Sequence, residues 1–303
     1  MRTLILAVAL LLCVSDVRAC DVCGCSIGGN YYGILPQFHR HFVGLRWSEQ
    51  TSFSAHSQSK LKNGGYDTEE RFQTLDLLTR FYPVKRVQML VLAPLHDFRQ
   101  WESDTYTHTR GIGDVSIMAN YVLYDTGDSM RYKWKQTFTL GGGIKLPSGQ
   151  FRLHNSNGEL YHPNLQPGTG STDFMVSANY TIRRGRWGLS ANSTARYNTA
   201  NRNQFRYGHR LNGGFNLFYW KNIRRVILLP NIGVFVDASQ SSKDKNESVE
   251  GSGGTIGLAT FGLDAYFGRV STGLTYQKPM YQNLGEGRVD SKPRLMATIN
   301  YIF

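Results

Sequence analysis

Three cysteines near the N-terminus are the residues best suited to chemistry in this chain. Cys20, Cys23 and Cys25 follow a CxxCxC spacing, and no cysteine occurs after them. Thiolates at this spacing can converge on one soft ion such as Cu(I) or Zn(II). His39 and His41 are close enough in sequence to add an imidazole. The pattern therefore predicts a copper or zinc site.

The residues before this cluster have the pattern of a secretory signal peptide. Arg2 gives a positive start, residues 4–14 are apolar, and residues 17–19 end in alanine, as a cleavage site requires. We expect residues 1–19 to be removed, so that Cys20 begins the mature chain. Two other uses of the cysteines stay open, namely lipidation of Cys20 and a disulfide in the oxidising periplasm, which would leave one thiol unpaired.

A second candidate for chemistry is a histidine two residues before a serine. The segment His154-Asn-Ser156-Asn-Gly158 resembles the HxSNG string of the outer-membrane phospholipase A family. That resemblance implies a histidine and serine on one strand face, acting as base and nucleophile. Here the string lies in a stretch rich in proline and glycine, and Phe151 stands where the family has glycine. We predict a loop and no enzyme, with a phospholipase as a minor alternative.

The elements that position these groups are predicted to be membrane-spanning strands. In the last ten residues, Leu295, Ala297, Ile299, Tyr301 and Phe303 fall on one face and mostly polar residues on the other, with Ile302 as the exception. One face suits lipid and the other water. An alternating strand that ends on an aromatic residue is typical of the last strand of an outer-membrane β-barrel.

Alternation of this kind recurs along the chain, so we predict an all-β fold: a transmembrane antiparallel up-and-down β-barrel of about 12 strands. A mean hydropathy of −0.35 is compatible with it, because only every second strand residue meets lipid. Residues 20–37 are predicted to form a periplasmic cysteine-rich segment and residues 38–303 the barrel. The predicted strands are 40–49, 71–82, 86–95, 114–124, 132–146, 172–183, 187–198, 206–219, 225–237, 257–267, 269–277 and 293–303.

The connections between these strands alternate in length, which sets the orientation. Short turns face the periplasm in bacterial barrels and long loops face outside, so both termini are predicted to be periplasmic. The predicted short turns are 83–85, 125–131, 184–186, 221–224 and 268. The predicted long loops are 50–70, 96–113, 147–171, 199–205, 238–255 and 278–292.

The strand face opposite the lipid is predicted to line a charged lumen. Two interpretations stay open: the charges pair across the barrel and nearly close it, or a narrow passage favours anions and polar organic molecules because arginine and lysine are in excess. Apolar residues at 227, 229, 235, 256 and 258 interrupt the polar face and either line an apolar pocket or pack under a loop. The candidate lumen residues are Arg46, Asp76, Arg80, Asp114, Lys135, Lys145, Asp173, Arg196, Arg206, Arg210 and Asp264.

Three glycine-rich runs suggest a family. They are Gly111-Ile-Gly-Asp-Val-Ser-Ile, Gly142-Gly-Ile-Lys-Leu-Pro-Ser-Gly149 and Gln166-Pro-Gly-Thr-Gly-Ser-Thr-Asp-Phe174. In this order they resemble the MetA-pathway of phenol degradation-like putative transporters. The resemblance, over residues 76–303, implies an outer-membrane barrel that passes hydrophobic or aromatic compounds, and it implies no catalytic residue. The cysteine-rich start departs from the family pattern.

Together these patterns predict a channel in a bacterial outer membrane that passes hydrophobic, aromatic or anionic small solutes. The alternative is a closed barrel that anchors a periplasmic segment for metal binding or for docking a protein partner. The net charge of +12 is assigned to lipopolysaccharide and to the lumen. No phosphate-binding glycine loop occurs, and no nucleic-acid partner is predicted.

The cysteine hypothesis predicts metal bound to the mature protein. We expect about one copper or zinc ion per chain, measured by elemental analysis, and loss of that metal when Cys20, Cys23 and Cys25 are all replaced by serine, because serine lacks a thiolate. Unchanged metal content in the triple variant would exclude the site.

Overall fold

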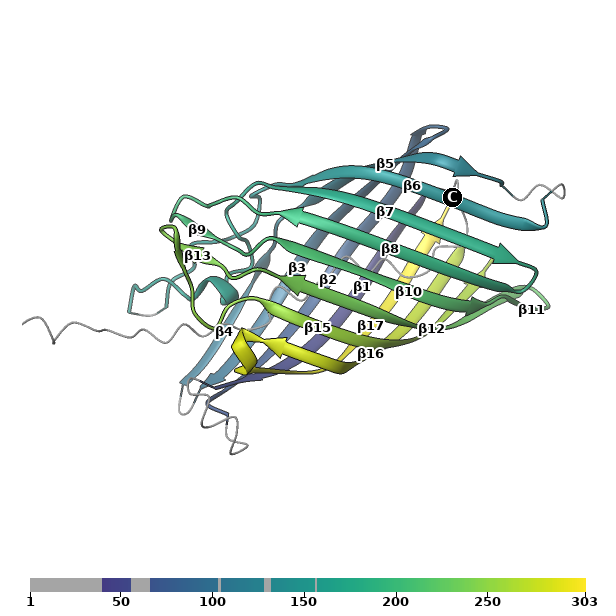
Figure 1. Ribbon diagram of the computed structural model, residues 1–303. Coiled ribbons are helices and arrows are strands. Elements are labelled where there is room, and N and C mark those ends of the chain that lie inside the picture. Colours follow the sequence, from purple (N-terminus) through teal and green to yellow (C-terminus); the bar gives the residue numbers. More distant parts are fainter. Residues whose placement is uncertain (1–39, 56–65, 103–104, 128–131, 156) are drawn as a thin grey trace, which may run out of the picture.

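The computed structural model describes residues 40–55, 66–102, 105–127, 132–155 and 157–303. The predicted signal peptide, the cysteine-rich segment with Cys20, Cys23 and Cys25, and Ser156 lie outside these residues. The described part folds into one closed antiparallel β-barrel (Figure 1). Its wall contains twelve strands, which confirms the predicted fold class and strand number.

Each wall strand pairs with its neighbours in the sequence, and the barrel closes where the first strand, β1, pairs with the last, β17. The pairing of β10 with β12 completes the ring. The wall strands are β1 (Phe42–Ser54), β2 (Thr68–Val84), β3 (Val87–Glu102), β5 (Ser116–Asp125), β6 (Trp134–Lys145), β7 (Asp173–Arg184), β8 (Trp187–Tyr197), β10 (Arg210–Tyr219), β12 (Val226–Ser239), β15 (Gly254–Phe267), β16 (Val270–Leu284) and β17 (Val289–Ile302).

Shorter elements lie at the two ends of the barrel. β9 (Phe205–Arg206), β13 (Lys243–Asp244) and β14 (Glu247–Ser248) form a small separate sheet among the long loops. β4 (Thr105–Ile112) pairs with the outer part of β3, and β11 (Lys221–Ile223) pairs with β12 at the short-turn end. Two 3₁₀ turns, η2 (Pro163–Leu165) and η3 (Gly285–Gly287), lie in the long connections. Figure 1 shows β9, β13 and η3 at the end opposite the short β7–β8 turn.

Several predicted long loops are wrong in extent because the strands continue beyond the lipid. The predicted loop 96–113 is largely the β3–β4 hairpin, and β16 runs on to Leu284 instead of ending at 277. Their polar residues indicated a loop, yet a strand that extends into water keeps its backbone hydrogen bonds without an apolar face. The opposite error occurs at Arg206, which lies on β9 and not in the wall, since β10 begins at Arg210.

The faces of the last strand follow the predicted alternation. Leu295, Ile299 and Phe303 are 38%, 52% and 57% exposed, as lipid-facing residues of an isolated barrel must be, whereas Asn300 is buried. Ile302, the exception in the pattern, is buried on the inner face. No helix among the described residues is long and apolar enough to span a membrane.

Ile299 lies midway along the lipid-facing stripe of β17, so a charge there should be costly. We expect Ile299→Arg to lower the free energy of unfolding by about 2–4 kcal/mol, as for arginine near the bilayer midplane. The measurement is a denaturant titration in lipid vesicles. The control is Asn283→Arg on the outer part of β16, where Asn283 is exposed, and a similar loss there would contradict the lipid-facing assignment.

Candidate functional site

Ion pairs between adjacent strands organise the polar interior. Arg46 on β1 stands directly opposite Asp76 on β2, and its Nε and Nη2 atoms lie 2.8 and 2.7 Å from Asp76 Oδ2. Arg210 on β10 donates two hydrogen bonds to Asp237 on β12, at 2.6 and 2.5 Å. All four side chains are buried. Two of the predicted lumen cations are therefore neutralised by neighbours.

A third ionic group joins three separate parts of the chain. Lys145, at the end of β6, lies 2.7 Å from Asp114 Oδ2 and 2.8 Å from Asp173 Oδ2. The three side chains are at most 5% exposed. Asp173 is opposite Lys145 in the β6–β7 register, and Asp114 precedes β5. We call these three residues the lysine node.

Asp114 of the lysine node also fixes the loop that follows β6. One carboxylate oxygen accepts a hydrogen bond from the backbone N–H of Gly149 at 2.9 Å. The other accepts from the backbone N–H and the hydroxyl of Thr169, at 2.9 and 2.6 Å. The backbone at Gly149 passes so close to Gly168 that a Cβ on Gly149 would lie 2.7 Å from the Gly168 Cα. The three glycine-rich runs of the sequence therefore meet at this node.

The same loop, residues 146–172, folds inward over the outer mouth. Leu165 of η2 is buried against Phe72 on β2 and Phe98 on β3. Its carbonyl accepts from the Thr109 hydroxyl at 2.5 Å, and the Pro163 carbonyl accepts from Tyr207 at 2.7 Å. Apolar contact and hydrogen bonds together hold this segment in place.

Two cavities lie on either side of this loop segment. The inner cavity has a volume of about 190 Å³, and the outer one, among the loops, has about 710 Å³. The inner cavity is bounded by Phe72, Leu92, Phe98, Met296, Arg46, Arg196 and Arg294, among others. Five residues border both cavities, namely Pro163, Asn164, Gln166, Thr169 and Tyr207. The folded loop is thus a partition between them.

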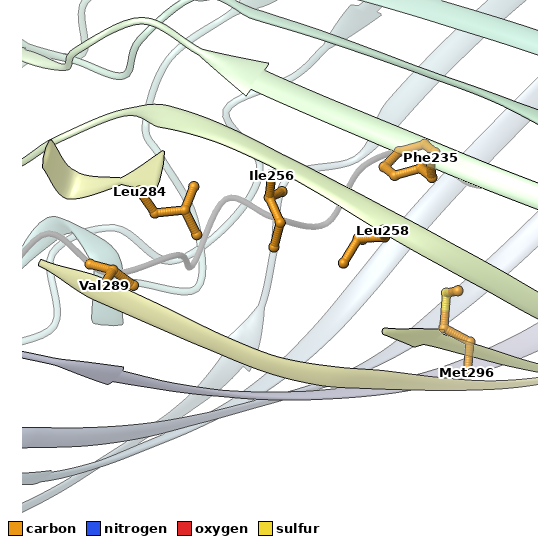
Figure 2. Packing of buried hydrophobic residues seen from close by; sticks show 6 residues of the cluster. All are labelled: Phe235, Ile256, Leu258, Leu284, Val289 and Met296. Atoms are coloured by element: carbon orange, nitrogen blue, oxygen red, sulfur yellow. The ribbon is translucent and has the colours of Figure 1, made fainter. Parts of the chain in front are cut away.

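An apolar wall lines one side of the lumen. Phe235 on β12, Ile256 and Leu258 on β15, and Met296 on β17 belong to one buried cluster with Leu284 and Val289. Figure 2 shows these six side chains along the inner side of adjacent strands. The apolar interruptions predicted at residues 235, 256 and 258 therefore form a continuous surface inside the barrel.

A second apolar cluster lines the lumen towards the short-turn end, with buried members on β1, β2, β10, β12, β15 and β17. It extends from Leu78 on β2 to Phe218 on β10, and these two strands lie six positions apart in a ring of twelve, on opposite sides of the barrel. We call this cluster the floor. Its buried members are Phe42, Leu78, Phe218, Leu229, Tyr266 and Ile302, with Leu92, Trp220 and Ile227 packed against them.

The remaining predicted lumen residues are more scattered. Arg80 is buried at the floor, where it lies 4.8 Å from the Phe42 ring centre and donates to the Arg40 carbonyl at 3.1 Å. Asp264 accepts a hydrogen bond from Asn231 at 3.1 Å. Lys135 and Arg196 are partly exposed on wall strands, whereas Arg206 lies in the loop sheet and contacts His209.

Arg294 and Asp237 are both buried and charged, although neither is among the lumen residues predicted from the sequence. Arg294 lies on the polar face of the last strand, which the alternation itself places inside. Asp237 ends a predicted strand at the position where it can pair with Arg210. The register between paired strands identifies the partners of both residues, and the sequence alone does not give that register.

The described residues on either side of Ser156 lie in a loop, as predicted. His154 is exposed and bridges to Leu160, and the Asn155 side chain accepts from the backbone N–H groups of Asn157 and Glu159 at 3.0 and 2.9 Å. Asn155 therefore shapes a turn. Among the described residues, no group of three or more histidine, cysteine or acidic side chains could hold a metal ion. The cysteine metal site lies outside this part and stays a prediction.

Comparisons with known proteins support the fold. No protein-family model matches the chain, and no curated protein matches it. A crystal structure of an outer-membrane channel from Pseudomonas putida F1 matches with a TM-score of 0.62 at 14% identity, over 91% of this chain and 100% of that one. The β-domain of the Bordetella autotransporter BrkA matches with a TM-score of 0.48 at 12% identity, over 88% and 100%. The chain is an outer-membrane β-barrel with the fold of a known channel.

The partition loop should respond to acid. Burial lowers the pKa of His162 to about 4, from an ordinary value near 6.5. A depressed pKa means that the neutral form is favoured when the loop is docked, so docking is fully stable above about pH 6.5 and weakens as the pH falls towards 4. We expect faster proteolysis of the loop at pH 4.5 than at pH 7.5. In His162→Gln this difference should shrink, and an equal difference in both proteins would contradict the assignment.

Proposed function

We propose that this barrel is a channel for small organic solutes that are hydrophobic, aromatic or anionic. The observation that carries this proposal is the inner cavity, which combines apolar side chains such as Phe72, Leu92 and Met296 with arginine side chains inside a membrane barrel. Ligand sites in proteins are usually concave and mostly apolar, with a few charged or polar groups. A cavity with these properties inside a barrel would be a binding point on a path between its two ends.

The path has four parts in series. A solute enters the outer cavity, passes the partition loop, occupies the inner cavity and crosses the floor. The partition is held mainly by Asp114 and by the burial of Leu165, and the floor is held by apolar packing with the Arg80 guanidinium against Phe42. In this proposal passage requires both to rearrange locally, because both narrow the path. The protein would then pass solutes selectively and conduct little between passages.

The floor also supports a second candidate, in which the barrel is a closed anchor for the cysteine-rich segment. In this candidate the floor, whose members run from β2 around to β10, would bar ions as well as solutes. In that case the cysteines would bind a metal ion or a periplasmic protein, and the barrel would only hold them at the membrane. Conductance separates the two candidates.

The test is the conductance of the full-length mature protein in a planar lipid bilayer. We expect small discrete steps with a preference for anions, and clearly larger steps for Phe218→Ala, because Phe218 is a buried aromatic member of the floor whose ring packs on Gly188. The matched control is Phe215→Ala on the same strand, since Phe215 is 59% exposed to lipid and should not affect conductance.

Folding of each variant is checked by gel mobility with and without heating, because truncation of a buried phenylalanine costs about 3–5 kcal/mol. Absence of steps from folded wild type and folded Phe218→Ala alike would reject the channel and favour the anchor.

A further inference from the structure

Arg294 occupies an unusual place among the buried charges. It is 5% exposed and lies on the inner face of β17, where it borders the inner cavity. Its neighbours in register are both neutral amides: Gln50 on β1 accepts from its Nε at 3.0 Å, and Gln277 on β16 accepts from its Nη1 at 3.4 Å. Among the described residues, Arg294 forms no ion pair with a carboxylate.

The charged groups that act most directly on Arg294 do not sum to zero. It interacts electrostatically with Arg46, Arg210 and Asp237. Asp76 pairs with Arg46, and Asp237 pairs with Arg210, so both carboxylates are already engaged. Within this set three guanidinium groups share two carboxylates, an excess of one positive charge, whereas the lysine node, which also borders the cavity, has one ammonium for two carboxylates.

An excess charge in a buried site is costly unless an anion completes it. Taking a charge out of water carries a penalty of several kcal/mol that hydrogen bonds to neutral amides offset only in part. A guanidinium has five N–H donors, and the two amides use two of them. The remaining donors have the planar geometry that binds a carboxylate through two parallel hydrogen bonds.

The surroundings of Arg294 also specify the rest of the ligand. Met296 is two residues along on the same inner face and joins the apolar wall, while Phe72 and Leu92 border the cavity from β2 and β3. An apolar cavity of about 150 Å³ binds one benzene molecule. The inner cavity, at about 190 Å³, has room for a ring of that size with one small acidic group.

From this arrangement we propose that the inner cavity is a binding site for small aromatic monocarboxylates, with Arg294 as the residue that recognises the carboxylate. Arg294 donates two hydrogen bonds to the carboxylate, and Met296, Phe72 and Leu92 contact the ring. Gln50 and Gln277 act as positioning residues, because they hold the guanidinium plane without neutralising it. This inference rests on the proposed function and narrows its solute class.

The test is calorimetric binding to the full-length mature protein in detergent, with three probes. Benzoate carries both features, benzyl alcohol has the ring without the charge, and acetate has the charge without the ring. We expect benzoate to bind at least about tenfold more tightly than either of the others, since a charge-assisted bidentate contact and the burial of a ring are each lost in one probe.

Variants then assign the contact to Arg294. We expect Arg294→Met to bind benzoate at least about tenfold more weakly and to leave benzyl alcohol unchanged. The matched control is Lys292→Met, two residues away on the same strand, where Lys292 pairs with Asp290 outside the cavity. It should bind all three probes as the wild type does. Arg294→Lys keeps the positive charge but lacks the planar guanidinium group. It replaces the methionine variant in this test if that variant does not fold, and it should lose part of the preference for benzoate over the other two probes.

Two results would overturn the inference: equal affinity of the wild type for benzoate and benzyl alcohol, or full retention of the benzoate preference in folded Arg294 variants. Conductance is measured separately on the same preparations. Benzoate binding without conductance would leave the site in place and reject the channel, whereas conductance without benzoate preference would reject the site and leave the channel.

Discussion

The burial of Lys145 between Asp114 and Asp173 is the interaction on which the interior depends. Asp114 shortly precedes β5, Lys145 ends β6 and Asp173 begins β7, so their pairing fixes these ends of the three strands relative to one another. Asp114 also accepts from Gly149 and Thr169, which ties the partition loop to the wall. Loss of Lys145 would leave two buried carboxylates uncompensated, a situation that typically costs about 3–5 kcal/mol. The loop that separates the two cavities is therefore anchored by charge as well as by apolar contact.

Different interactions stabilise the outer surface of the barrel, its interior and its short-turn end. Its outer surface is apolar because it meets lipid, and its backbone hydrogen bonds are all made between strands, as a bilayer requires. Inside, adjacent strands neutralise one another's charges at Arg46–Asp76 and Arg210–Asp237. Towards the short turns, aliphatic and aromatic side chains replace these pairs and form one buried cluster on the inner face of the wall. The charged cavity and the apolar floor follow one another along the lumen. The cavity would select a solute by its charge, and the floor by its apolar surface.

Stability and selectivity are in tension at Arg294. A leucine at this position would pack against Met296 without an electrostatic penalty, whereas the guanidinium needs amide partners on both neighbouring strands. Burying Arg294 is costly, and its side chain is still held in a defined orientation. This combination favours a role in recognising a ligand over a role in stabilising the fold. The apolar wall beside it supplies contact area without direction, so the charge sets the orientation of a bound molecule.

The sequence by itself determined the barrel, because alternation along a strand depends only on which face meets lipid. It predicted twelve strands, the inward-facing charges at residues such as Asp76 and Lys145, and the apolar interruptions at Phe235 and Leu258. It did not predict which charges pair, nor that β3 and β16 extend as hairpins into water, since both depend on register between strands far apart in the chain. The pairing of strands around the ring was needed to show that Arg294 has no carboxylate partner among the described residues, that one loop folds inward between two cavities, and that Phe218 and Leu78 belong to one floor. The physical reason is that alternation along one strand determines which face a residue lies on. The partner of that residue depends on the register between strands, which is set when the barrel closes.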